Sequence, residues 1–231
     1  MLTAVLTLLA IMSASLNLRA EYLGPQYQVY LFKPLTMVFI ILIAMQARKP
    51  VSARYKYAII VGLLFSLAGD IFLMLPTDLF IAGLVSFLIA HLIYIVAFRV
   101  DVRLRFSGRS LGSLAPFVIY GVIMFVVLAP YAGGMLVPVL VYMVAILVMA
   151  WQAEERWSQT RQRGALLAFI GAALFVISDS ALAVNRFRGQ YYAATALVLG
   201  TYFAAQWLIA LSVGYGSGDE KWQESHESRS G

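Results

Sequence analysis

Hydrophobic residues dominate eight long stretches of this chain, and short polar segments separate them. The stretches cover residues 2–18, 31–46, 57–75, 80–98, 113–129, 135–151, 164–184 and 192–213. A helix needs about 17–25 mostly apolar residues to cross a bilayer. The pattern therefore predicts an all-α, polytopic membrane bundle of eight transmembrane helices over residues 1–213, followed by a polar, disordered tail at 214–231.

Composition supports the membrane assignment and excludes several kinds of site. The 231 residues are 62% hydrophobic and 12% charged, whereas a soluble domain is about half apolar and a quarter charged. The chain has no cysteine, and one of its two histidines lies in the polar tail, so neither thiol chemistry nor a histidine-rich metal site is expected. The net charge of +6 comes from basic clusters between apolar stretches, which indicates membrane topology rather than nucleic-acid binding.

Lysine and arginine are concentrated in alternate connections. With eight spans, the segments 47–56, 99–112 and 152–163 and the C-terminal tail share one side of the membrane and carry most of the basic residues. The other side carries Arg19, Lys33, Arg186 and Arg188. Because basic loops are retained in the cytoplasm, we expect a multi-pass protein of the cell (inner) membrane with both termini in the cytoplasm.

Two aspartates, Asp70 and Asp179, interrupt the apolar stretches and are the strongest indication of a site. A carboxylate in the hydrocarbon core costs about 2.5–3.5 kcal/mol on insertion scales, and such residues usually serve a function. Each aspartate follows a glycine by eight residues, Gly62 in one case and Gly171 in the other. This match predicts a parallel 4+4 internal repeat.

The spans that follow the two aspartates align as well. Phe87 pairs with Tyr202, and His91 pairs with Gln206. In a parallel repeat the two aspartate-bearing spans run in the same direction, so both carboxyls are expected at equal depth, nearer the outer face than the cytoplasmic one.

Further polar residues are expected to converge with the aspartates on a cavity that opens outward. They are Lys33, His91, Tyr94, Tyr22, Asn185 and Arg186. Structural explanations remain open for each: Asp70 can form an ion pair with Lys33, and Asp179 can be hydrogen-bonded by its neighbouring serines near a helix end. His91 can be a core histidine, and the tyrosines can be packing aromatics.

Burial and mutual repulsion favour a proton on at least one of the two carboxyls near neutral pH. A protonated acid beside a carboxylate suits general acid–base catalysis. It equally suits a proton-coupled lipid or small-molecule transporter. The alternatives differ in one observable, because an enzyme releases a product whereas a transporter moves its substrate unchanged.

The segments that carry these residues resemble the YhhN family of multi-pass membrane proteins, whose characterised members are lysoplasmalogenases. The resemblance covers nearly the whole membrane region, in YLGPQYQVYLFKPLT, GLLFSLAGDIFLMLP, FIAGLVSFLIAHLIYIVAF and ALFVISDSALAVNRF. It implies hydrolysis of the vinyl ether bond of a lysoplasmalogen, a lysophospholipid drawn from the surrounding membrane lipids, to a fatty aldehyde and a glycerophospho-base, with no metal or cofactor. By the same resemblance, Asp70 and Asp179 match the family's acidic positions, and Lys33, His91, Tyr94 and Ser178 match further polar positions.

The chemistry implied by the resemblance agrees with the paired acids. An enol ether hydrolyses when an acid protonates its β-carbon and water captures the resulting oxocarbenium ion, and two carboxylates can divide such roles as they do for glycosides. The predicted catalytic residues are the acid–base pair Asp70 and Asp179, with His91 and Tyr94 orienting the water or tuning the pair. The predicted substrate-binding residues are Lys33 and Arg186 at the phosphate, together with Ser178, Asn185 and Tyr22.

Overall fold

The computed structural model describes residues 1–48, 50–102 and 108–215, and within these ranges the regular structure is entirely helical. The helices are α1 (Leu2–Leu23), α2 (Gln26–Met45), α3 (Ala53–Met74), α4 (Phe80–Phe98), α5 (Gly108–Ala132), α6 (Leu136–Thr160), α7 (Arg163–Phe187) and α8 (Ala194–Ser212). A single 3₁₀ turn, η1 (Gly133–Met135), joins α5 to α6. The predicted all-α class is confirmed, whereas nearly all of the predicted tail lies outside the described residues.

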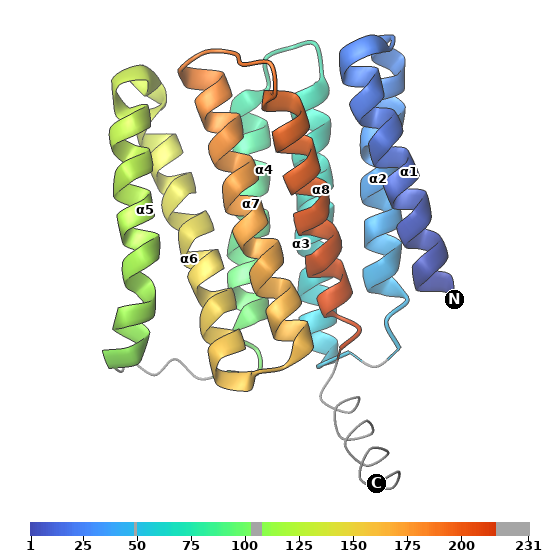
Figure 1. The fold of residues 1–231 in the computed structure, drawn as a ribbon, viewed down its shortest axis with the longest axis vertical. Helices are drawn as coiled ribbons and strands as arrows, with labels where there is room; N and C mark the ends of the chain where they lie inside the picture. The colour runs from blue at the N-terminus through green and yellow to red at the C-terminus, as the bar shows by residue number, and fades with distance from the viewer. Residues whose placement is uncertain (49, 103–107, 216–231) are drawn as a thin grey trace, which may run out of the picture.

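Seven stretches of the described chain are long and apolar enough to cross a membrane. One of them, Gly112–Thr160, contains both α5 and α6, which fold back on each other in Figure 1. Gly133 makes this reversal possible with a φ of +50°, a conformation that costs glycine little. The membrane-spanning character is therefore clear, and eight separate crossings remain a prediction.

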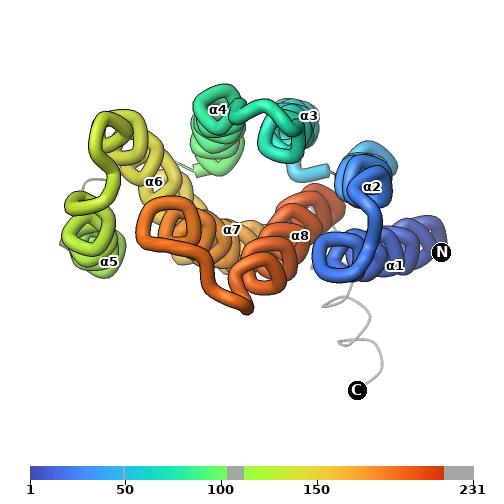
Figure 2. The backbone as a smooth tube through the Cα atoms, turned by 90° about the horizontal axis from the view of Figure 1, so that it is seen from above, coloured from blue at the N-terminus to red at the C-terminus, as the bar shows by residue number. Residues whose placement is uncertain are grey.

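The centre of the bundle consists of two helix pairs that face each other. Figure 2 shows α3 and α4 on one side and α7 and α8 on the other, with α1 and α2 at one edge and α5 and α6 at the opposite edge. Helix α2 packs on α3 and α8, and helix α6 packs on α7 and α4. In the predicted repeat α2 corresponds to α6, α3 to α7 and α4 to α8. The two sets of contacts are then equivalent, in agreement with the predicted repeat.

Glycine contacts follow the same pairing. A Cβ atom at Gly62 would lie 2.2 Å from the ring of Tyr94, and one at Gly171 would lie 2.9 Å from Ile209. The two glycines are equivalent in the predicted repeat, as are Tyr94 and Ile209. Both glycines therefore allow a close approach within their helix pair. The duplication itself remains a prediction.

The N-terminus, the end of α8 and the described parts of the basic connections lie at one end of the bundle. In Figure 1 the N-terminus of α1, the α2–α3, α4–α5 and α6–α7 connections and the end of α8 are all at the bottom. We call this the basic end, and the end that carries the α3–α4 and α7–α8 connections the opposite end. The basic connections share one end as the sequence predicted, as far as they are described, whereas Lys49, Arg103, Arg105, Lys221 and Arg229 lie outside the described residues. The placement of the basic end in the cytoplasm remains a prediction.

Four predicted helix boundaries are wrong by five residues or more, including the end of α1 and the start of α5. Helix α6 was expected to stop at residue 151 and continues to Thr160, so residues 152–160 form helix rather than a polar loop. Helix α2 was expected to begin at residue 31 and begins at Gln26. Pro34 consequently lies inside this helix rather than at its start.

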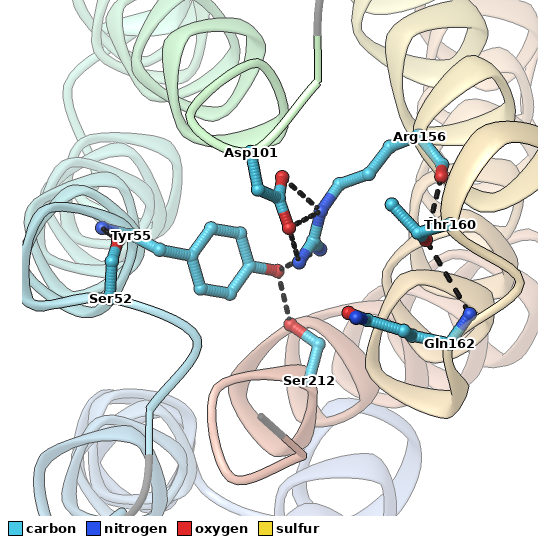
Figure 3. Close-up of polar contacts among 7 residues, drawn as sticks. All are labelled: Ser52, Tyr55, Asp101, Arg156, Thr160, Gln162 and Ser212. Carbon is cyan, nitrogen blue, oxygen red and sulfur yellow. Dashed lines mark hydrogen bonds and ion pairs between the residues drawn. The ribbon is translucent and has the colours of Figure 1, made fainter. Parts of the chain in front are cut away.

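The extended part of α6 is stable because its charged residues have partners. Arg156 is fully buried, and its Nε and Nη2 atoms each donate to the carboxylate of Asp101 at 2.9 Å. Its Nη1 donates to the hydroxyl of Tyr55 at 3.0 Å, and that hydroxyl lies 2.6 Å from Oγ of Ser212. Figure 3 shows how this cluster ties α3, the start of the α4–α5 connection, α6 and α8 together at the basic end.

Arg156→Lys is expected to destabilise the bundle by about 1.5–3 kcal/mol, the contribution of a hydrogen bond to a charged group. Lysine keeps the charge but cannot donate in parallel to both Asp101 and Tyr55. Thermal melting of the purified protein in detergent measures the effect. Arg54→Lys, at an exposed position of α3, is the matched control, and equal melting temperatures for the two variants would contradict the assignment.

Candidate active site

Asp70 lies in a closed ionic cluster between three helices. The residue is 2% exposed, and Oδ1 lies 3.5 Å from Nζ of Lys33 on α2. Tyr202 on α8 donates its hydroxyl to Oδ2 at 2.5 Å. The ion pair with Lys33 that the sequence left open as a structural alternative is therefore present, and it balances this carboxylate.

Asp179 lies in a different cluster without such a cation. The hydroxyl of Tyr142 on α6 donates to Oδ2 of Asp179. Nε2 of His91 on α4 lies 3.4 Å from the same oxygen and 3.0 Å from the Tyr142 hydroxyl. In the described part of the chain, no lysine or arginine forms an ion pair with Asp179. Carboxyl, phenol and imidazole are thus joined so that a proton can move among them.

An aromatic layer separates the two clusters. The ring of Tyr202 packs edge-on against Phe175 with centroids 5.5 Å apart, and Phe175 packs edge-on against His91 at 4.7 Å. Phe87 completes the layer by contacting Tyr202 and Phe175. The carboxyls of Asp70 and Asp179 therefore have separate hydrogen-bond partners.

The two clusters occupy equivalent places in the predicted repeat. Each aspartate has one partner on the preceding helix, which is α2 for Asp70 and α6 for Asp179. Its second partner lies in the other half of the chain, on α8 for Asp70 and on α4 for Asp179. Lys33 and Tyr202 reach Asp70, whereas Tyr142 and His91 reach Asp179. The decisive difference is a cation at one carboxyl and a neutral phenol at the other, so only the first is balanced by a full charge.

Asp179 also borders two small cavities, each of about 40 Å³. One lies between α5, α6 and α7, where Tyr120, Tyr142 and Ser180 add polar groups to the wall. That is space for about one water, and most of the surrounding wall is apolar. The other cavity is also mainly apolar and extends between α4, α6 and α7 to Phe80 and Phe187 at the opposite end. A lipid chain can enter it only if side chains move.

A further cavity lies away from the two aspartates. It measures about 350 Å³ and lies between α1, α2 and α8, with lining residues such as Ile40, Phe203 and Trp207. Neither aspartate lines it, and its wall is almost wholly apolar. A groove of this kind on a membrane helix bundle is a place for hydrocarbon and supplies no acid–base chemistry.

Tyr94 and Ser178 lie near the aspartates but do not contact them. The hydroxyl of Tyr94 donates to Oε1 of Gln206 at 3.0 Å. Oγ of Ser178 donates to the carbonyl of Val198 at 3.0 Å. The first bond joins α4 to α8, and the second joins α7 to α8. The observed contacts of these two residues are therefore structural. Their predicted catalytic and binding roles stay predictions.

The remaining predicted binding residues lie at or close to the opposite end. The hydroxyl of Tyr22 donates to the carbonyl of Tyr192 at 3.1 Å. Arg186 donates to Asp78 at 2.6 Å, and Asn185 precedes it in the last turn of α7. Arg186 therefore has a carboxylate partner that the sequence did not suggest, and it stands above the second cavity rather than beside the aspartates.

The sequence did not predict Tyr142, Tyr202 or Asp78 as site residues. Tyr142 lies in a continuous apolar stretch and carries no local mark of its contact with Asp179. Tyr202 aligns with Phe87 in the predicted repeat, but nothing in the sequence marks its hydroxyl as a partner of Asp70. Asp78 precedes α4 and accepts a hydrogen bond from the amide of Phe80 at 3.3 Å, so by sequence it has the character of a helix start.

The sequence of this chain is similar to those of known membrane proteins. The model of the YhhN family matches residues 28–213. An "Uncharacterized membrane protein YhhN" from Escherichia coli O157:H7 is 31% identical over 202 residues, which cover 87% of this chain and 95% of the relative. "Lysoplasmalogenase TMEM86B" from Sus scrofa is 33% identical over 190 residues, covering 78% of this chain and 72% of the relative.

A human relative extends the comparison. "Lysoplasmalogenase TMEM86A" from Homo sapiens is 32% identical over 165 residues, which cover 67% of this chain and 64% of the relative. No solved structure matches the chain significantly. The family match includes α2 to α8, and with them both aspartates and the residues that contact them. This chain therefore belongs to the YhhN family.

Proposed function

We propose that this protein is a membrane-embedded lysoplasmalogenase that hydrolyses the vinyl ether bond of alkenyl lysophospholipids. The observation that carries the proposal is the cluster of Asp179, Tyr142 and His91, whose carboxyl borders two small, mainly apolar cavities, one of which extends to the opposite end. The relatives named lysoplasmalogenase support the reaction class. The expected substrates are alkenyl-glycerophosphoethanolamine and alkenyl-glycerophosphocholine.

The reaction needs one proton on carbon and one water. The carboxyl of Asp179 gives its proton to the β-carbon of the vinyl ether, which leaves an oxocarbenium ion beside the new carboxylate. Water adds to the α-carbon of this cation and loses a proton to the carboxylate. The hemiacetal then breaks its bond to the glycerol oxygen, which takes up a proton, and the products are a fatty aldehyde and a glycerophospho-base.

Tyr142 and His91 are suited to support this proton transfer. The Tyr142 hydroxyl contacts both the carboxyl and the imidazole, so it can hold the carboxyl in place and pass a proton between them. General acid–base catalysis requires such contacts within hydrogen-bond reach. Water approaches from the α5 side and the lipid from the other side of Asp179, which keeps nucleophile and substrate on separate faces.

Asp70 receives a positioning role in this proposal. Its carboxylate is held by Lys33 and Tyr202, and Tyr202 in turn packs on Phe175, which supports the ring of His91. Asp70 thereby holds Tyr202 and Phe175 in place beside the ring of His91. Arg186 is the proposed phosphate contact, and Lys33, Ser178, Asn185 and Tyr22 remain predicted members of the binding site.

The test is aldehyde release from an alkenyl lysophospholipid by the purified protein, with an acyl lysophospholipid of the same headgroup as control. We expect aldehyde from the first lipid and no fatty acid from the second. In D₂O the aldehyde should carry one deuterium on the carbon next to the carbonyl, because the enzyme protonates that carbon. Movement of intact lipid across a vesicle membrane without aldehyde would instead indicate a transporter.

A further inference from the structure

An exposed ion pair stands at the mouth of the cavity that leads to Asp179. Nη2 of Arg186 lies 2.6 Å from Oδ2 of Asp78, and the two side chains are 45% and 68% exposed. The guanidinium of Arg186 lies 4.8 Å from the ring centroid of Phe80. Phe80 packs edge-on against Phe187 at 5.9 Å, and both rings line the cavity. The pair is therefore continuous with the route to the acid.

The charges follow a fixed order along this route. Arg186 covers the ring of Phe80 in the cavity wall, and Asp78, the more exposed of the two, lies in the α3–α4 connection and accepts from the Phe80 amide. Exposure to solvent therefore increases from the apolar wall to the cation and then to the anion. A single-chain phospholipid with an amine headgroup has the complementary order of hydrocarbon chain, phosphate and ammonium.

We propose that Arg186 and Asp78 together form a headgroup site that selects zwitterionic lysophospholipids, with Arg186 binding the phosphate and Asp78 binding the ammonium group. This inference rests on the proposed function, because it assumes that the ligand's chain extends toward Asp179. Asp78 is the specificity-determining residue of the site. A headgroup that ends in an anion or a neutral alcohol leaves it without a partner.

The existing ion pair can open for such a ligand at little cost. Ion pairs between exposed side chains contribute little to stability, and a zwitterion gives each side chain a new partner of the same charge as the one it loses. The hydrogen bond from Arg186, assisted by that from the Phe80 amide, holds the pKa of Asp78 below its usual range. The carboxylate is therefore charged at neutral pH and available to an ammonium group.

Binding of saturated 1-O-alkyl lysolipids tests the inference independently of catalysis, since they lack the vinyl ether. Dissociation constants are measured in detergent for phosphoethanolamine, phosphocholine and phosphoglycerol headgroups on one chain length. We expect the parent to bind the two zwitterionic lipids about fivefold more tightly than the anionic one, the scale of one exposed charge contact. Asp78→Asn should remove this preference.

The exchanged pair Asp78→Arg/Arg186→Asp is the sharpest variant, because it keeps an ion pair but reverses the order of charges. It should fold like the parent, lose the preference for zwitterions and bind all three lipids more weakly. Glu21→Gln, which removes an exposed carboxylate from the last turns of α1, is the control and should keep the preference.

The outcomes separate the two proposals. Equal binding of all headgroups by the parent, or an unchanged preference in Asp78→Asn or in the exchanged pair, would overturn the headgroup site even if the protein releases aldehyde. Headgroup preference that depends on Asp78 would support the site even if no aldehyde is formed, and in that case the proposed reaction would fail on its own assay.

Discussion

Asp179→Asn is expected to lower aldehyde release from an alkenyl lysophospholipid by about 10²–10⁴-fold, the usual contribution of a general acid or base. Asparagine has the same shape and still accepts the hydrogen bond that Tyr142 gives to Asp179, but its amide cannot deliver a proton to carbon. The melting temperature should therefore stay within a few degrees of the parent. The initial rate of aldehyde formation, determined by chromatography of a hydrazone derivative, measures the loss.

Two further variants make this prediction specific. Tyr142→Phe removes only the hydroxyl that joins Asp179 to His91, and we expect a smaller loss than for Asp179→Asn. Glu21→Gln is again the control for removal of an acidic group outside the site. Parental activity in Asp179→Asn would show that Asp179 is not the proton donor.

The second large effect is expected on stability. Asp70→Asn should destabilise the protein by about 3–5 kcal/mol, because Lys33, with a side chain only 12% exposed, would keep its charge without a counter-ion. The double variant Lys33→Met/Asp70→Asn removes both charges and should recover most of the loss, since apolar groups can replace a buried ion pair at little cost. Thermal melting in detergent measures both steps.

Activity of the double variant then distinguishes positioning from catalysis. If Asp70 only holds Tyr202 and the aromatic layer in place, aldehyde release should return together with stability. If Asp70 takes part in proton transfer, stability should return and activity should not, which would contradict the positioning role. A single Asp70→Asn variant that melts like the parent would contradict the ion pair itself as a source of stability.

The sequence was most informative where one physical rule acts on many residues at once. Long apolar stretches must satisfy their backbone groups within a helix, so the helical class and most helix positions followed directly, with Phe80–Phe98 matching the predicted 80–98. The rule that charges avoid hydrocarbon singled out Asp70, Asp179 and Lys33. His91 entered through its place in the next predicted span, and the structure brings it to Asp179.

The ends of helices were harder to predict from the sequence, because they depend on contacts with residues far away in the chain. Gln152, Glu155 and Arg156 read as the start of a polar loop, yet all three are buried in α6. Arg156 can be buried because Asp101 and Tyr55 satisfy its guanidinium. Those partners come from the start of the α4–α5 connection and from α3, so no local rule could reveal them.

The pattern of residues along the chain was enough to predict a helical membrane protein with two carboxyls inside its apolar region. Both conclusions follow from transfer energies, which belong to each residue separately. The contacts of Lys33 with Asp70, of Tyr142 and His91 with Asp179, and of Arg186 with Asp78 became known only from the folded structure. They join residues that packing brings together across helices, and they show that a cation balances Asp70 but not Asp179. The sequence could not reveal this difference because it depends on distances between helices.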